Sequence, residues 1–146
     1  MPEFRIINAK EKDIEILTSM KLVTMIDDEM DKKLSHKEKN KIKDSITSNI
    51  ELNYKKYKMI LVDQTVVGAY LVDDYLDGQM LDELYLFKDY RRKGIGSKIL
   101  RKLIKSIRKL YVWVYASNSV ALEFFRKFGF ITVSEDRKST RLNSSH

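Results

Sequence analysis

The residues best suited to chemistry in this chain are three cations and two glycines between positions 91 and 97. The stretch reads RRKGIGS, from Arg91, Arg92 and Lys93 through Gly94, Ile95 and Gly96 to Ser97. A turn that opens a helix leaves backbone N–H groups unpaired, and glycines without a Cβ let an anion approach them closely. One exposed contact of this kind contributes only about 0.3–1 kcal/mol, so several must act together. The stretch therefore predicts a phosphate-binding turn.

Spacing separates the known phosphate-binding motifs. A P-loop requires GxxxxGK[ST], which this chain lacks, and a dinucleotide fingerprint requires a third glycine three residues after Gly96, where the chain has Ile99. A basic, solvated helix start with ordinary turn glycines is the simplest alternative.

The turn needs a strand before it and a helix after it, and the sequence predicts both. Residues 81–87, LDELYLF, have the composition and length of a strand. After the turn, Ile99, Leu103 and Ile107 recur every fourth residue, with Leu100 and Ile104 beside them, which predicts an amphipathic helix with a basic outer face. Further strands are predicted at 4–8, 57–62, 66–72 and 111–116, and further helices at 13–30, 35–54 and 118–128. Val23 should face inward from the first of these helices. Ser35 and Glu38 form a capping box at the start of the second, which makes His36 a surface residue of its first turn. Ser117 or Asn118 should cap the third helix, and Gly129 should end it.

Composition limits the class of protein. A chain of 146 residues with 43% hydrophobic residues predicts one domain with a sizeable core. No apolar run approaches the roughly 18 residues of a membrane span, and the first residues lack a signal peptide's apolar region, which predicts a cytoplasmic protein without a membrane partner. The absence of cysteine and the presence of two histidines predict no metal site. A net charge of +7 is compatible with nucleic acid, an acidic membrane surface or a polyanionic cofactor.

The pattern Arg91-x-x-Gly94-x-Gly96, preceded by an acidic and then apolar strand, resembles the [RQ]xxGxG motif of the GNAT N-acetyltransferase superfamily. A second segment, NSVALEFFRKFGF, is similar to that superfamily's other signature. Its matching positions are Asn118, Ala121, Phe124, Phe125, Gly129 and Phe130.

The resemblance spans residues 4–135 and implies an α/β (α+β) fold. A mixed, mostly antiparallel central sheet is flanked by helices in the order β-α-α-β-β-β-α-β-α-β. It also implies acetyl-CoA as co-substrate, held where the fourth strand splays from the fifth. Pantetheine amides would pair with the backbone of Leu84, Tyr85 and Leu86, and the pyrophosphate would lie over Arg92–Ser97. Arg91, Asn118 and Phe125 complete the implied cofactor residues.

Two acidic residues are candidates for the catalytic base. Relatives that acetylate amines often carry an acid at the position of Asp82, so Asp82 is preferred and Glu83 is second. The two side chains point to opposite faces of a strand, so at most one faces the acceptor. Many relatives carry a tyrosine as general acid where this chain has Phe125. That role falls to water, to another tyrosine such as Tyr115, or to no group at all, since a CoA thiolate is a fair leaving group unaided.

The last eleven residues, DRKSTRLNSSH, differ in kind from the rest. They are polar, lack periodicity and resemble one reading frame of a widely used sequencing adapter. The sequence therefore predicts a domain at 1–135, a non-native tail at 136–146 formed by adapter read-through, and a missing final strand. The edge left open would favour a homodimer.

Three functions follow as alternatives. The resemblance favours transfer of acetyl from acetyl-CoA to a small-molecule or peptide amine by direct attack. The acidic residues near 27–31 lie near the end of a predicted helix, where negative charge is unfavourable. They form a solvated face or, as the alternative, attract a cationic acceptor. A basic nucleic-acid-binding domain would show binding that falls steeply with salt. A GNAT-like protein that binds acyl-CoA without turnover is the third alternative.

Overall fold

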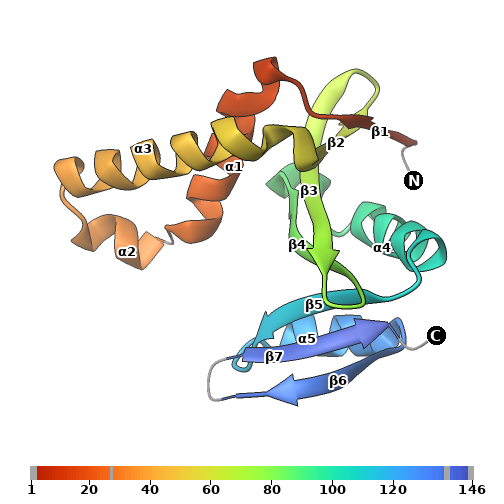
Figure 1. Ribbon diagram of the computed structural model, residues 1–146. Coiled ribbons are helices and arrows are strands. Elements are labelled where there is room, and N and C mark those ends of the chain that lie inside the picture. The colour runs from red at the N-terminus through yellow and green to blue at the C-terminus, as the bar shows by residue number, and fades with distance from the viewer. Residues whose placement is uncertain (1–2, 27, 137–138, 145–146) are drawn as a thin grey trace. The chain divides into compact units, whose positions relative to one another are not determined.

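The computed structural model describes residues 3–26, 28–136 and 139–144 (Figure 1). The chain separates into two compact units, one formed by residues 4–69 and the other by the residues from Tyr70 onward together with the N-terminal end of the chain. The strand order is β1-β2-β3-β4-β5-β7-β6, and β3 (Thr65–Tyr75) has residues in both units.

The unit at residues 4–69 combines two paired strands with three helices. Strand β1 (Phe4–Asn8) runs antiparallel to β2 (Tyr57–Val62). Helix α1 (Ile14–Met25) follows a short 3-10 turn, η1 (Glu11–Asp13), and packs against α3 (His36–Asn53), which ends in a second such turn, η2 (Tyr54–Lys56). The predicted capping box is confirmed, because Ser35 and Glu38 exchange hydrogen bonds at the start of α3. Leu17, Met20, Ile46 and Ile50 are buried in this unit.

The helix predicted at 13–30 is wrong in its second half. Helix α1 ends at Met25, Ile26 is extended, and a separate helix, α2, occupies Asp28–Lys33. The acidic residues therefore begin a helix, where negative charge is favourable, and the argument for an acidic helix C-terminus no longer holds; Asp27 lies outside the described residues. Val23, predicted to face inward, is 60% exposed.

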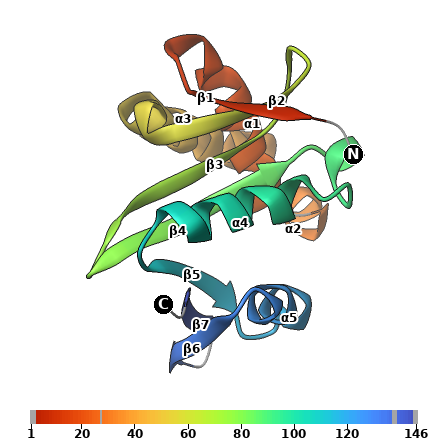
Figure 2. The same ribbon diagram turned by 90° about the vertical axis from the view of Figure 1, so that its right-hand side faces the viewer.

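The second unit contains the predicted chemistry. After β3 come β4 (Gly78–Leu86), η3 (Lys88–Tyr90), α4 (Ile95–Ser106) and β5 (Leu110–Tyr115). Helix α5 (Ser119–Lys127) then leads to β6 (Phe130–Glu135) and β7 (Ser139–Ser144). Strands β4 and β5 are parallel, whereas β7 is antiparallel to β5 and β6. Figure 2 shows α4 alongside β4 and α5 alongside β7. The predicted mixed, mostly antiparallel sheet flanked by helices is confirmed.

Helix α4 forms where the periodicity predicts it. Gly94 precedes it with φ +81°, a left-handed conformation that disfavours residues with a Cβ, and its carbonyl accepts the first helical hydrogen bond from the N–H of Lys98 at 3.1 Å. The predicted apolar stripe is buried at Ile99, Leu100 and Leu103. The turn and the helix are thus joined through one glycine.

The prediction that the final strand is missing is wrong. Residues 139–144 form β7, which lies between β5 and β6 and pairs with both. A sheet accepts this polar segment because its backbone supplies the ladder hydrogen bonds and Leu142 faces the core with no exposed surface. Thr140, Asn143 and Ser144 are buried as well, which is unusual for polar side chains. The pairing removes the open edge on which the expected homodimer rested.

We therefore expect Leu142→Ala to destabilise the protein by about 2–5 kcal/mol, the usual cost of truncating a fully buried leucine. Urea unfolding measures the change, and Ile131→Ala on the neighbouring strand β6 is the matched control because Ile131 is 53% exposed. Equal unfolding midpoints for the two variants would show that β7 does not pack as described.

Candidate active site

The predicted cofactor residues surround the place where β4 and β5 separate. Parallel pairing joins Gln79 to Leu110 and ends at the pair Leu81–Val112. Beyond that pair β4 continues to Leu86, while β5 continues to Tyr115 paired with β7 on its other side. Residues 84–86 therefore lie beyond the parallel pairing of β4 with β5. We call the place where the two strands separate the opening, and the edge of β4 there is one at which an amide-bearing chain can pair.

The phosphate-binding turn predicted at 91–97 follows directly. Arg92 has φ +60° and Gly94 φ +81°, so the backbone turns sharply before α4 begins at Ile95. The N–H groups of Ile95, Gly96 and Ser97 fall in the first turn of the helix, where no intrahelical acceptor exists. The structure brings together the three features that an anion site needs, which are a helix start, a tight turn and nearby cations.

Gly96 leaves this turn open. A Cβ built at Gly96 would meet only the Leu86 Cδ1 atom, at 3.8 Å, which is ordinary contact distance. The fold therefore does not require glycine there for its own packing. A close approach by a ligand would require it.

Arg91 is held against the end of β4. Its Nε donates a hydrogen bond to the Leu86 carbonyl at 2.8 Å, and its guanidinium lies 5.4 Å from the centre of the Tyr85 ring. Tyr85 in turn contacts Phe87 edge to face. Arg91 thus fixes the junction of strand and turn, and the Leu86 carbonyl, predicted to pair with pantetheine, already accepts one hydrogen bond.

The two candidate bases lie at the first residues beyond the β4–β5 pairing. Side chains alternate along a strand, so Asp82 and Glu83 leave opposite faces, as predicted. Asp82 is exposed and Glu83 is partly buried. Since Leu81 pairs with Val112, the next residues, Asp82 and Trp113, leave the same face of the sheet.

The second sequence signature forms α5. The Asn118 side chain caps the helix by accepting a hydrogen bond from the Ala121 N–H at 3.1 Å, and Gly129 ends it with φ +89°, both as predicted. Phe125 contacts Phe124 and Phe130. A phenylalanine ring has no acidic proton, so Phe125 cannot act as a general acid.

A polar cluster at the β3–β4 hairpin was not predicted from the sequence. The Tyr111 hydroxyl donates a hydrogen bond to Asp77, and Lys109 forms an ion pair with the same carboxylate at 2.9 Å. These two contacts, that of Tyr111 being the larger cause, lower the pKa of Asp77 to about 2. Gly78 is required beside them, because a Cβ there would lie 2.2 Å from the Lys109 carbonyl oxygen.

We expect Asp77→Asn to lower the melting temperature at pH 7, and the difference from the parent chain to shrink as the pH falls from 4 to 2. The pKa of Asp77 in the folded protein lies below its ordinary value, so its stabilising contribution is present above that value and is lost as the pH falls through the folded pKa. Thermal unfolding over this pH range measures the effect. Glu123→Gln removes an exposed carboxylate of α5 as a control, and a constant difference at every pH would contradict the assignment.

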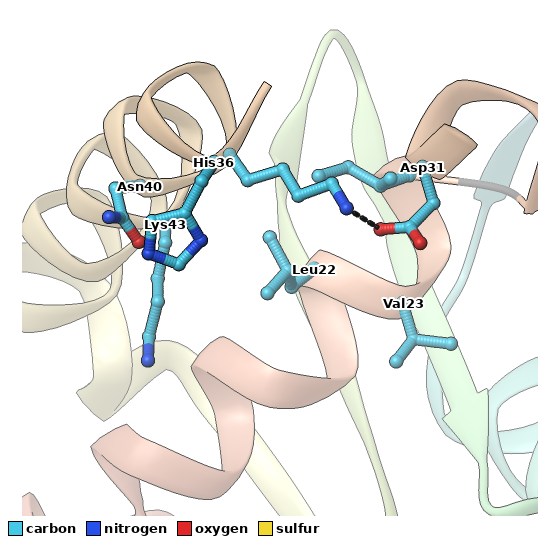
Figure 3. Close-up of a pocket in the computed structure, with 8 residues that line it drawn as sticks. Leu22, Val23, Asp31, His36, Asn40 and Lys43 are labelled. Carbon is cyan, nitrogen blue, oxygen red and sulfur yellow. Dashed lines mark ion pairs between the residues drawn. The ribbon is translucent and has the colours of Figure 1, made fainter. Parts of the chain in front are cut away.

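A separate pocket of about 430 Å³ lies within the unit at residues 4–69 (Figure 3). Leu22 and Val23 of α1 form an apolar wall, and Lys39 of α3 pairs with Asp31 of α2 at 2.9 Å. His36 is exposed at its rim, where the sequence predicted a surface residue. None of the predicted catalytic or cofactor residues lines this pocket.

Within the residues that the structure describes, no group of three or more His, Asp or Glu side chains could hold a metal ion. No helix in that part of the chain is long and apolar enough to cross a membrane.

Comparison with known proteins identifies the family. Residues 55–132 match the model of the acetyltransferase (GNAT) domain, which is more than half of the chain. The chain belongs to the GNAT acetyltransferase family.

Individual relatives agree with this assignment. A probable spermine N(1)-acetyltransferase of Bacillus subtilis subsp. natto is 29% identical over 65 residues, which cover 40% of this chain and 43% of that protein. The chain spans about two fifths of the length of the curated relatives it matches.

Solved structures share the fold. The PaiA N-acetyltransferase of Thermoplasma acidophilum, in complex with coenzyme A, matches with a TM-score of 0.72 at 18% identity over 99% of both chains. An N-acetyltransferase of Staphylococcus aureus Mu50 matches with a TM-score of 0.75 at 17% identity, over 95% of this chain and 99% of that one.

Proposed function

We propose that this protein transfers an acetyl group from acetyl-CoA to a primary amine by direct attack of the amine within a ternary complex. The observation that carries the proposal is the end of β4–β5 pairing at Leu81–Val112, followed by a glycine turn into the start of α4. The opening can take the pantetheine arm, and the turn can take the pyrophosphate. Membership of the GNAT family supports both assignments.

Each part of the cofactor has residues suited to it. Backbone groups of Leu84, Tyr85 and Leu86 pair with the pantetheine amides, as a neighbouring strand would. The first N–H groups of α4 and the cations Arg92 and Lys93 bind the pyrophosphate. Asn118, which caps α5, and Phe125 of α5 complete the proposed cofactor residues.

The acceptor must lose a proton before it can attack. A lysine-like amine has a pKa of about 10.4, so holding it neutral at pH 7 costs about 4.6 kcal/mol. Asp82 accepts this proton, directly or through one water, as the nitrogen forms its bond to the thioester carbonyl carbon. Glu83 leaves the opposite face of the strand and is second in preference.

Collapse of the tetrahedral intermediate breaks the C–S bond and releases CoA as a thiolate. Phe125 cannot protonate it, so the proton comes from water or from Tyr115, whose side chain is 73% exposed at the end of β5. A CoA thiolate leaves adequately without help, which makes the absence of a tyrosine at position 125 compatible with turnover.

Release of free thiol from acetyl-CoA over a panel of primary amines tests the proposal. We expect amine-dependent release with one acetylated amine formed per thiol. CoA binding without thiol release on any amine would leave the acyl-CoA-binding alternative, and salt-sensitive binding to nucleic acid without CoA affinity would support the nucleic-acid alternative.

A further inference from the structure

Acidic and basic residues are separated along the sequence of the second unit. Residues 73–83 contain five acidic residues and no basic one, although the whole chain has a net charge of +7. The following turn and α4 are strongly basic. The basic part suits the phosphates of the cofactor, and the acidic part suits a cation. The acidic residues are Asp73, Asp74, Asp77, Asp82 and Glu83.

A cation already lies among aromatic rings beside this acidic stretch. The guanidinium of Arg141, on β7, is 5.9 Å from the ring centre of Tyr75, 5.8 Å from that of Tyr111 and 5.8 Å from that of Trp113. Its Nη1 donates a hydrogen bond to the Tyr75 hydroxyl at 2.8 Å. We call these three rings the aromatic seat. Such rings attract ammonium and guanidinium groups through their negative faces.

Arg141 fits the aromatic seat incompletely. Its Nε is buried and has no hydrogen-bond partner, which is costly for a charged group. All three rings come from β3 and β5, whereas the cation comes from the polar segment after Glu135. The seat is therefore built by the body of the domain, and Arg141 is its occupant.

The aromatic seat and the proposed base share one face of the sheet. Trp113 pairs with Arg141, so both side chains leave the same face, which is also the face of Asp82. Trp113 is 48% exposed, and a pocket of about 370 Å³ lies against it, lined by Trp113, Val114, Tyr115 and Ser139. A ligand on this face can therefore contact the ring of Trp113 on the same side of the sheet as the Asp82 side chain.

We propose that the aromatic seat is a subsite for the acceptor, and that it binds the second positive charge of an amine that carries two. The inference rests on the proposed function, with one amine reacting near Asp82 while a distal ammonium or guanidinium group lies among the rings. Arg141 stands in for that distal group and competes with it.

Trp113 is the chain's single tryptophan, so its fluorescence reports on the aromatic seat without any need for turnover. We expect Arg141→Ala to bind methylguanidinium, the head group that the variant lacks, with a saturable change in emission. Half-saturation should fall at about tenfold lower concentration than in the parent chain. N-methylurea, a neutral analogue, should give no response. Adding Tyr75→Leu to this variant should remove the gain.

Arg101→Ala is the matched control, because it removes a guanidinium that lies 5.5 Å from the Phe128 ring elsewhere in the same unit. If it responds as Arg141→Ala does, the aromatic seat is not a cation site. If circular dichroism shows that Arg141→Ala does not fold, Arg141→Met, which keeps an apolar side chain of similar length, takes the place of Arg141→Ala in every measurement.

Turnover then connects the seat with the acceptor. In Arg141→Ala, the ratio of kcat/KM for 1,4-diaminobutane to that for 1-aminobutane should rise about tenfold over the parent chain. An unchanged ratio overturns the subsite while turnover itself upholds the proposed function. If no amine is acetylated, the proposed function fails. The aromatic seat is then tested by titrating both amines at matched ionic strength and following the tryptophan emission. Tighter binding of the diamine supports a cation subsite, and equal binding of the two amines overturns it.

Discussion

Gly96→Val is expected to weaken CoA binding by at least about 100-fold while the protein stays folded. The side chain would project into the side of the turn where the pyrophosphate is proposed to lie. Among the described residues outside the first turn of α4, the atom nearest to a Cβ there is Leu86 Cδ1, at 3.8 Å. Losing two or more charge-assisted hydrogen bonds to the N–H groups accounts for a change of this size. Isothermal titration calorimetry with CoA measures it.

Two further substitutions separate binding from folding. Gly96→Ala should unfold at a higher urea concentration than the parent chain, because alanine is favoured over glycine in a helix by about 0.5–1 kcal/mol. Its affinity for CoA should nevertheless be lower than that of the parent chain. Gly94→Ala should unfold at a lower urea concentration than the parent chain, because φ is +81° at that position and alanine disfavours this conformation. Unchanged CoA affinity in Gly96→Val would show that the turn at residues 91–97 does not bind the pyrophosphate.

Asp82→Asn should lower kcat/KM for the amine by about 10²–10⁴-fold, the usual contribution of a general base, and leave acetyl-CoA affinity nearly unchanged. The amide keeps the shape of the side chain but cannot accept the proton. Steady-state kinetics with varied amine, together with a direct acetyl-CoA titration, provide the two measurements.

Glu83→Gln is the control for this prediction, because Glu83 is adjacent and also acidic but leaves the other face of β4. We expect it to change kcat/KM by less than about threefold. A small effect of Asp82→Asn beside a large effect of Glu83→Gln would exchange the two assignments.

The elements that periodicity governs were predicted well. The stripe through Ile99 and Leu103 predicted α4, and the Ser35–Glu38 capping box placed the start of α3. The break after Met25 was missed because no glycine or proline marks it and the apolar pattern continues through Ile26. Strand β7 was missed because its backbone pairing depends on β5 and β6 and leaves no alternation in its own sequence.

The site was predictable only where the chemistry is local. The turn at Gly94-Ile95-Gly96 is determined by consecutive residues, and it forms as expected. The aromatic seat joins Tyr75 to Arg141 across 66 positions, and only the tertiary pairing of strands brings such residues together. One local signal did exist, since Tyr111, Trp113 and Tyr115 alternate along β5 and so share a face.

The position of β7 in the sheet affects the order in which the chain can fold during synthesis. In the strand order β6 adjoins only β7, so residues 130–135 have no sheet partner until residues 139–144 have left the ribosome. The outer edge of β5 stays uncovered for the same interval, and such an edge readily captures another chain. Closure of this sheet therefore waits until residues 139–144 have emerged, and a pause in synthesis after β6 has emerged but before that point should increase the fraction of nascent chains lost to aggregation.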